Sequence, residues 1–201
     1  MNEIFARVSP EKRNRILNSA LDEFAEKGFE LASTNEIVEN AGISKGLLFH
    51  YFGNKQKLYD YLIEFSYDYV TKLLENGIDW GERDFFKRAE KITSLKLSAM
   101  QEYPRIYDFL KKAMEKLSME YIRCQFPSGL TEITERVYTE NIDDSLFRSD
   151  LDLDRAKEII RWTVEGAAEK LWKNSPDDIV LENAIEEHRE YMNMLRTLMY
   201  K

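Results

Sequence analysis

The sequence has few residues that could cross-link the chain or interrupt a helix, and it has no long apolar run that could anchor the chain in a membrane. It holds a single cysteine, Cys124, so no disulfide can form within it, which agrees with a reducing compartment. Only 8 glycines and 4 prolines interrupt its 201 residues. It has no stretch of about 18 consecutive apolar residues that could cross a membrane. Because its first residues also lack the apolar core of a signal peptide, we expect a cytoplasmic protein.

Clusters of catalytic or metal-binding residues are absent as well. The two histidines, His50 and His188, lie far apart in the chain, and neither stands with Cys, Asp or Glu at a spacing typical of metal ligands. The sequence contains no glycine-rich phosphate loop and no nucleophile elbow. These absences argue against an enzyme, and we expect neither a metal nor another cofactor.

Charge is distributed unevenly along the chain. A net charge of −8 disfavours nucleic-acid binding, because attraction to phosphates provides most of the non-specific affinity. Residues 1–60, however, carry 8 Lys and Arg against 9 Asp and Glu, so the acidic excess lies mostly downstream. Residues 44–57 contain three lysines and no carboxylate. A local basic surface near the N-terminus is therefore compatible with an acidic protein.

Apolar residues recur at spacings of three and four, so the sequence predicts an all-α fold. Ser9, followed by a proline, predicts the start of a helix that Gly28 ends. Ser33 and Glu36 predict a capping box for a second, short helix, and Asn54 predicts the cap of a long fourth helix. After the short third helix at 45–52, helices are expected at residues 55–76, 82–102, 104–122, 128–140, 152–174 and 176–200.

The segment between the second and third helices, residues 41–44, has the composition of the tight turn in a helix-turn-helix. The third helix should direct Leu48 and Phe52 toward the core. Its opposite face then presents Lys45, Gly46, Phe49 and His50. We expect this face to enter the major groove of DNA, where a carboxylate would be repelled by phosphates.

Residues 34–59, TNEIVENAGISKGLLFHYFGNKQKLY, resemble the DNA-binding signature of the tetracycline-repressor (TetR) family of bacterial transcriptional regulators. Leu47 departs from the family pattern, which often has Thr or another small residue there, and so contacts either a thymine methyl group or no base. The residues that the resemblance places on DNA are Thr34, Ser44, Lys45, Gly46, Leu47, Phe49, His50, Tyr51 and Lys55.

The resemblance assigns different roles to these residues. It implies phosphate contacts by Thr34 and Ser44 at helix N-termini, and base contacts by Lys45 and Gly46. Lys55 is implied to anchor the start of the fourth helix on the DNA backbone. His50 and Tyr51 are implied to contact the groove or a phosphate, with Phe49 beside them, and the ring of the tyrosine lies either in the core or at the DNA.

The resemblance also implies the architecture. We expect an N-terminal helix-turn-helix DNA-binding domain at residues 1–54, joined by the fourth helix to a helical ligand-binding and dimerisation domain at residues 55–201. In such regulators the last two helices form a four-helix dimer interface. A two-fold dimer would place two recognition helices in successive major grooves, ~34 Å apart, on a near-palindromic operator.

An effector cavity is implied for the C-terminal domain, and its many Met and aromatic residues favour an apolar or aromatic small molecule. The same residue types also fill ordinary cores, so each of them has a purely structural alternative. The predicted pocket residues are Tyr67, Met100, Tyr103, Tyr107, Phe109, Met114 and Trp162.

The last two helices carry small and apolar residues at helical spacings, which predicts a homodimer interface. Burial of these residues within one chain is the alternative. The predicted interface residues are Ile160, Thr163, Ala167, Leu171, Ile185, His188, Met192, Leu195 and Met199.

These observations predict a ligand-responsive transcriptional regulator, most simply a repressor that leaves its operator when an effector shifts the fourth helix. One alternative is a helical small-molecule-binding protein, or an enzyme, that has lost DNA binding. Another is a regulator controlled by a partner protein instead of a ligand. The double-stranded operator and a second copy of the chain are the expected partners, and no membrane is expected.

Overall fold

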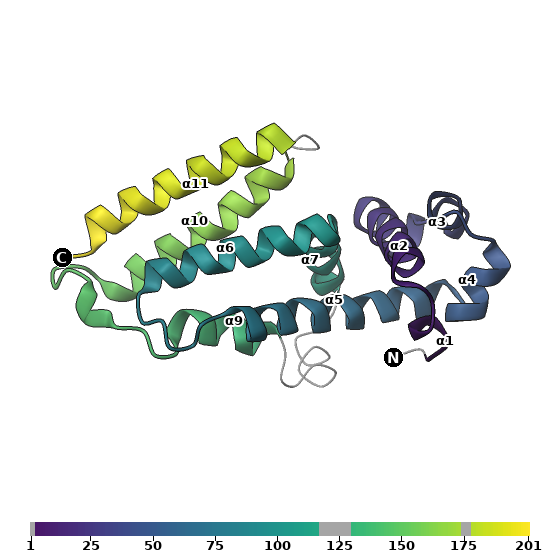
Figure 1. Cartoon of the computed structure of the whole chain (residues 1–201), viewed down its shortest axis with the longest axis horizontal. Helices are drawn as coiled ribbons and strands as arrows, with labels where there is room; N and C mark the ends of the chain where they lie inside the picture. The colour runs from purple at the N-terminus through teal and green to yellow at the C-terminus, as the bar shows by residue number, and fades with distance from the viewer. Residues whose placement is uncertain (1–2, 117–129, 174–177) are drawn as a thin grey trace. The chain divides into compact units, whose positions relative to one another are not determined.

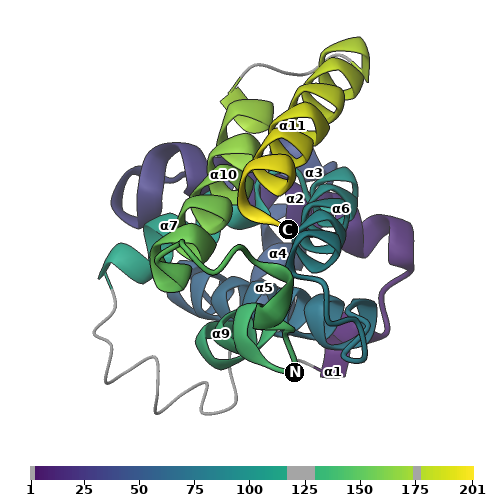
Figure 2. The same cartoon turned by 90° about the vertical axis from the view of Figure 1, so that its left-hand side faces the viewer.

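The computed structural model describes residues 3–116, 130–173 and 178–201, and within these ranges the chain forms helices and no extended strand (Figures 1 and 2). The predicted all-α fold is confirmed. In chain order the elements are α1 (Glu3–Ala6), α2 (Pro10–Leu31), α3 (Thr34–Ala41), α4 (Lys45–Phe52), α5 (Lys55–Gly77), α6 (Phe85–Glu102), α7 (Ile106–Lys116), α9 (Leu130–Thr139), the short 3₁₀ helix η1 (Asp144–Leu146), α10 (Leu153–Lys173) and α11 (Asp178–Met199).

Local interactions shape the turn between α3 and α4. Gly42 ends α3 with φ 64° and ψ 41°, in the left-handed region that favours glycine. Ser44 then caps α4, because its Oγ accepts a hydrogen bond from the Leu47 N–H at 3.2 Å. Asn54 caps α5 through the Lys57 N–H at 2.9 Å, as predicted. Residues of the turn itself therefore set the end of α3 and the start of α4.

Two helix starts are stabilised differently from the prediction. Ser9 precedes α2, but its side chain makes no capping hydrogen bond. Ser33 caps α3 by accepting from the Asn35 N–H at 3.3 Å, while its own N–H donates to Glu23 Oε1 at 2.7 Å. The capping-box role predicted for Glu36 is thus taken by Glu23, a buried carboxylate of α2. That prediction was wrong because packing brings a sequence-distant acid to the helix start.

The helix α2 also extends beyond its predicted end. Gly28 has φ 71° and ψ 172°, a conformation outside the helical range that favours glycine. The chain then makes one more turn to Leu31, and the Ala32 N–H donates to the Gly28 carbonyl at 3.1 Å. Gly28 therefore kinks the end of α2 without terminating it.

The N-terminal core includes a residue that sequence reasoning missed. Phe5 of α1 is fully buried, with its ring centre 4.8 Å from that of Phe52, 5.4 Å from that of Tyr51 and 5.7 Å from that of Tyr61. These rings belong to α4 and α5, so α1 links both helices. Burying one such side chain contributes about 1.5–3 kcal/mol. A single-turn helix shows no periodicity from which it could have been predicted.

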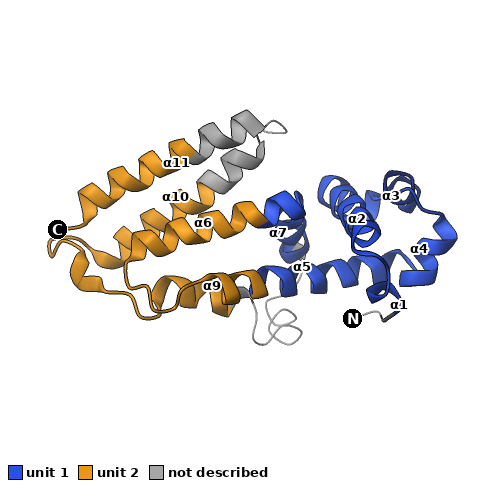
Figure 3. Cartoon of the chain, in the orientation of Figure 1, with its two compact units in different colours: residues 1–71, 99–130 blue, residues 72–98, 131–201 orange. Residues whose placement is uncertain are grey.

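The chain divides into two compact units (Figure 3). Unit 1 comprises residues 1–71 and 99–130, and in it α2 contacts both α3 and α7. Unit 2 comprises residues 72–98 and 131–201, and in it α10 and α11 lie side by side (Figures 1 and 2). The predicted domain boundary between residues 54 and 55 lies inside unit 1. The division into a DNA-binding domain at residues 1–54 and a ligand-binding and dimerisation domain at residues 55–201 remains a prediction.

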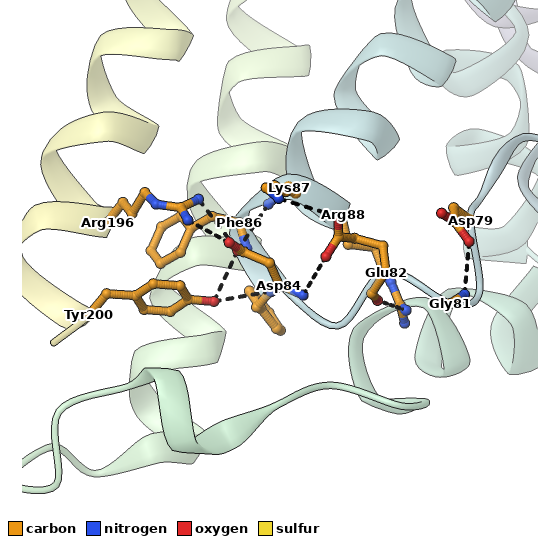
Figure 4. Close-up of polar contacts among 10 residues, drawn as sticks. Asp79, Gly81, Glu82, Asp84, Phe86, Lys87, Arg88, Arg196 and Tyr200 are labelled. Carbon is orange, nitrogen blue, oxygen red and sulfur yellow. Dashed lines mark hydrogen bonds and ion pairs between the residues drawn. The ribbon is translucent and has the colours of Figure 1, made fainter.

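In unit 2, Asp84 at the start of α6 holds the end of α11 (Figure 4). Its carboxylate accepts hydrogen bonds from the Arg196 guanidinium and, at 3.1 Å, from the Tyr200 hydroxyl. The same carboxylate accepts the Phe86 N–H at 3.0 Å and so caps α6. A backbone bridge between Phe147 and Tyr200 adds a further link. Together these contacts fix the position of α11 along α6.

Arg88 is a second buried charge in unit 2, with 2% of its surface exposed. Its guanidinium donates to the backbone carbonyls of Trp80, Glu82, Val137 and Glu140. These carbonyls lie in the loop before α6 and at the end of α9. A buried cation that satisfies several carbonyls locks both segments in place.

Asp84 makes the stability of the protein depend on pH. Burial alone would raise the pKa of Asp84, but the hydrogen bonds from Arg196, the Lys87 N–H and Tyr200 outweigh it and hold the pKa below its ordinary 3.8. A carboxyl whose pKa is lowered by folding stabilises the fold above pH 3.8, and this contribution is lost as the pH falls through the lowered value. Asp84→Asn should therefore lower the free energy of unfolding at neutral pH by about 1–3 kcal/mol.

The same variant should show a shallower loss of stability on acidification below pH 3.8. Urea denaturation at neutral and acidic pH measures both effects. Asp154→Asn, which removes an exposed carboxylate of α10, is the matched control. An acid slope in Asp84→Asn that equals that of the unaltered protein would contradict this role.

Candidate DNA-binding site

One side of α4 forms an exposed surface, which we name the reading face: Lys45, Gly46, Phe49 and His50. Phe49 is half-buried and the other three residues are exposed. On the opposite side, Leu48 and Phe52 are buried, with 0% and 4% of their surfaces exposed. Because these two apolar side chains anchor the helix in the core, the reading face is directed outward. Leu47, beside it, is half-buried.

The ammonium of Lys45 is held in a defined position at the start of α4. Its Nζ donates to Asn35 Oδ1 of α3 at 2.9 Å and lies 5.9 Å from the ring centre of Phe49. Two further N–H groups of the ammonium remain for another acceptor. Asn35 is thus a site residue that sequence reasoning missed. No local pattern connects it with a lysine in the next helix.

Thr34 and Ser44 lie where predicted, at the N-terminal ends of α3 and α4. Helix N-termini attract phosphates because their backbone N–H groups are free and the helix dipole is positive there. Ser44 Oγ accepts a hydrogen bond from the Leu47 N–H, and the hydroxyl proton of Ser44 can still be donated to another acceptor. The first turn of α4 contains no acidic residue. The site is therefore suited to bind an anion.

Lys55 has a structural role besides the predicted DNA contact. Its Nζ donates to the Glu30 carbonyl at 3.2 Å and lies 4.9 Å from the ring centre of Phe29. These contacts join the start of α5 to the last turn of α2. The side chain is half-buried, and its ammonium has two N–H groups left for a phosphate oxygen.

Tyr51 and His50 differ in burial although they are adjacent. Tyr51 is half-buried, with its ring centre 5.4 Å from that of Phe5, so its ring belongs to the core. His50 is exposed, with its ring centre 5.9 Å from that of Tyr51. Of the two, His50 is the exposed side chain.

Comparisons with known proteins agree with this geometry. Residues 16–62, which include α3 and α4, match the family model described as bacterial regulatory proteins, tetR family. The chain is 25% identical to the HTH-type transcriptional regulator YdgC of Bacillus subtilis over 79% of this chain and 80% of that protein. It is 23% identical to the HTH-type transcriptional repressor KstR2 of Mycobacterium tuberculosis over 81% of this chain and 82% of that protein.

A crystal structure of a TetR family transcriptional regulator from Chloroflexus aurantiacus has the same fold, with a TM-score of 0.65. It is 22% identical, and the match covers 99% of this chain and 98% of that chain. The chain belongs to the TetR family. As a TetR-family member it is a DNA-binding transcriptional regulator and not an enzyme.

Most residues predicted to line an effector pocket in this TetR-family protein lie in unit 1. Tyr67, Tyr103 and Phe109 are buried, whereas the others in this unit are half-buried. Among the half-buried ones, the Tyr107 hydroxyl is enclosed and has no hydrogen-bond partner in the part of the chain that the structure describes. Trp162, by contrast, is 58% exposed on α10 of unit 2, and its assignment to the pocket remains a prediction. The unit 1 residues are Tyr67, Met100, Tyr103, Tyr107, Phe109 and Met114.

Of the predicted dimer-interface residues whose side chains the structure describes, most are buried within the chain. Ile160, His188, Met192 and Met199 are buried, with at most 8% of their surfaces exposed. They pack within their own chain, so the second copy that the prediction required is not needed to cover them. Thr163 and Leu195 are half-buried. The side chains of Ala167, Leu171 and Ile185 lie outside the described residues.

The described residues form neither a metal site nor a membrane-spanning helix. Within the described ranges, His, Cys, Asp and Glu side chains form no group arranged to hold a metal ion. No described helix is both long and apolar enough to cross a membrane.

Proposed function

We propose that this TetR-family protein is a repressor that binds a near-palindromic operator as a homodimer and releases it when a small effector binds. The observation that carries the DNA contact is the reading face, which is exposed, free of acid and adjacent to two helix N-termini. A surface with these properties is complementary to a major groove flanked by phosphates.

Within this proposal, Lys45 and Gly46 contact base edges. A Cβ built on Gly46 would meet no heavy atom within 4 Å, so packing inside the chain does not require glycine there. The missing side chain instead leaves room for a base edge to approach the backbone. Thr34 and Ser44 then bind phosphates of the same half-site, and Lys55 binds the backbone beside it.

A different surface from the predicted one supports the homodimer. We name it the apolar stripe: Ile159 and Trp162 of α10 with Tyr191, Met194 and Leu198 of α11. Between 42% and 58% of each of these side chains is exposed. Large apolar side chains gathered on two adjacent helices mark an interaction site. A second copy of this chain would cover the apolar stripe, because a near-palindromic operator requires two recognition helices related by a two-fold axis.

Gly166 gives independent support for close approach of another helix. It is exposed and follows Ile159 and Trp162 at intervals of seven and four residues, so all three lie on one side of α10. A Cβ added to Gly166 would meet no heavy atom within 4 Å in this chain. A residue without a side chain on an otherwise apolar stripe allows a facing helix to pack against the backbone.

Effector-driven release is supported by polar links inside unit 1. Lys112 of α7 donates to the carbonyls of Ala25 and, at 3.0 Å, Glu26 in α2. The Tyr103 hydroxyl donates to Asn14 Oδ1 of the same helix at 3.0 Å. A ligand that moves α7 would therefore also move α2, and with it the reading face. Such a ligand shifts the population away from the DNA-binding state.

Selection of binding sites from a random pool of duplex DNA tests this function. We expect enrichment of a near-palindromic sequence whose half-site centres are about one helical turn, or a multiple of it, apart. Binding to the enriched duplex should weaken steeply with salt concentration, because contacts to phosphates release counterions. Recovery of no preferred sequence would contradict the proposal.

A further inference from the structure

Lys96 differs from the other partly buried cations of unit 2. Arg196 is paired with Asp84, Lys157 with Asp144 at 2.6 Å, and Arg88 with several carbonyls. Lys96, in the second half of α6, is half-buried, and within the described part of the chain no carboxylate lies at ion-pair distance from it. A cation that has lost part of its hydration without gaining a partner is costly.

A second polar group near Lys96 is also incompletely bonded. Thr93, one turn earlier on α6, bonds His188 of α11 through an Oγ1–Nε2 contact of 3.0 Å. The Nδ1 atom of His188 is enclosed and has no hydrogen-bond partner in the described residues. Burial lowers the pKa of His188, and the charge of Lys96 lowers it further, so the two groups are close enough to interact.

The charged groups of α10 leave Lys96 without full compensation. Burial lowers the pKa of Lys96; the charge of Glu165 opposes this shift, and that of Arg161 adds to it. Glu165 is itself paired with Arg161, since Oε1 lies 3.5 Å from Nε. The positive charge of Lys96 is therefore available to an external anion.

Apolar side chains dominate the neighbouring positions of the three helices. Ile92 and Leu95 of α6, Ile160 and Val164 of α10, and Met192 of α11 are all buried. A ligand held at Lys96 would thus have the polar pair Thr93 and His188 and the ion pair of Arg161 and Glu165 nearby, with apolar side chains around them. Sites of this kind select amphiphilic molecules, because a few polar contacts fix the orientation of an apolar body.

We propose that Lys96 binds the carboxylate of a small, otherwise apolar organic acid whose apolar part packs between α6, α10 and α11, with Thr93 and His188 beside the anion. This inference rests on the proposed effector-responsive function and names the chemical class of the effector. The acid supplies a negative charge at ion-pair distance from Lys96, which no carboxylate of the described residues does, and a charge-assisted hydrogen bond is stronger than a neutral one.

A panel of straight-chain and aryl monocarboxylates, each paired with its uncharged primary amide, tests the proposal by calorimetry on the full chain. We expect at least one acid to bind about tenfold or more tightly than its amide, the range for a hydrogen bond to a charged group. Lys96→Met should abolish this preference. Lys91→Met, which removes an exposed lysine of the same helix, should retain it. Equal binding of acids and amides, binding of neither, or a preference that survives in Lys96→Met would overturn the proposal.

A second measurement needs no ligand. Because the unpaired ammonium is a cost in the free protein, Lys96→Met should raise its melting temperature, whereas Lys91→Met should leave it unchanged. A lower melting temperature for Lys96→Met would mean that Lys96 already has a stabilising partner, and would overturn the inference.

The same titrations distinguish failure of this inference from failure of the proposed function. Operator binding is followed by fluorescence anisotropy while the acid is added. An acid that binds through Lys96 without releasing DNA supports the site and contradicts effector-driven release. Release of DNA by a neutral ligand, with no role for Lys96, supports the proposed function and contradicts the site.

Discussion

Replacing Lys45 with alanine is expected to weaken binding to the selected operator about tenfold to a hundredfold, because one side-chain contact to a base edge is worth about 1–3 kcal/mol. The loss should be larger for the preferred sequence than for unrelated DNA. Sequence preference should also relax at the contacted base pair. Fluorescence anisotropy with operator and mutated operator duplexes measures both quantities.

Two other lysines serve as comparisons for Lys45. Lys111→Ala removes an exposed lysine of α7 and should leave operator affinity unchanged. Lys55→Ala should weaken binding to all sequences and reduce its salt dependence, since its proposed contact is to the backbone. It should also lower stability, because the contacts with the Glu30 carbonyl and the Phe29 ring are lost. If Lys45→Ala binds operator with unchanged affinity and preference, the reading face does not lie in the groove.

Changing Met194 to aspartate is expected to separate the homodimer into monomers. Met194 is 53% exposed and lies in the middle of the apolar stripe on α11, so the new carboxylate would be buried against the second copy without a partner. Operator affinity should then fall about a hundredfold or more, because the two half-sites are no longer bound together. Light scattering coupled to size-exclusion chromatography measures the mass, and anisotropy measures the affinity.

Asn193→Asp is the matched control for this change. It adds the same charge one residue earlier on α11, at another exposed position that points about 100° away from Met194. Both variants should keep the helical content of the unaltered protein, because neither residue is in the core. A Met194→Asp protein that still elutes with the mass of a dimer would rule out the apolar stripe as the interface.

The dimer surface illustrates how far sequence patterns reach. Apolar residues on α10 and α11 form two stripes, one containing Ile160 and Met192 and the other Ile159 and Met194. Helical spacing detects both stripes but does not show which one the chain covers with its own side chains. The structure buries the first stripe and exposes the second. The homodimer itself remains a proposal, now based on different residues.

Longer-range polar contacts could not be predicted for a similar reason. Asn35 reaches Lys45 across the turn, and Glu23 replaces Glu36 as the partner of the α3 cap. Nothing in the spacing of these residues distinguishes them from solvated surface groups. Their partners follow from how α2, α3 and α4 pack together.

By itself, the sequence determined the turn between α3 and α4, the outward reading face and the family. These features depend on interactions within a few residues: the left-handed Gly42, the hydroxyl cap of Ser44, and the buried pair Leu48 and Phe52 one turn apart. Only the tertiary structure decided which apolar stripe remains exposed, and that the half-buried Lys96 has no carboxylate at ion-pair distance among the described residues. Burial and charge compensation depend on neighbouring helices that are distant in sequence, so spacing within one helix carries no information about them.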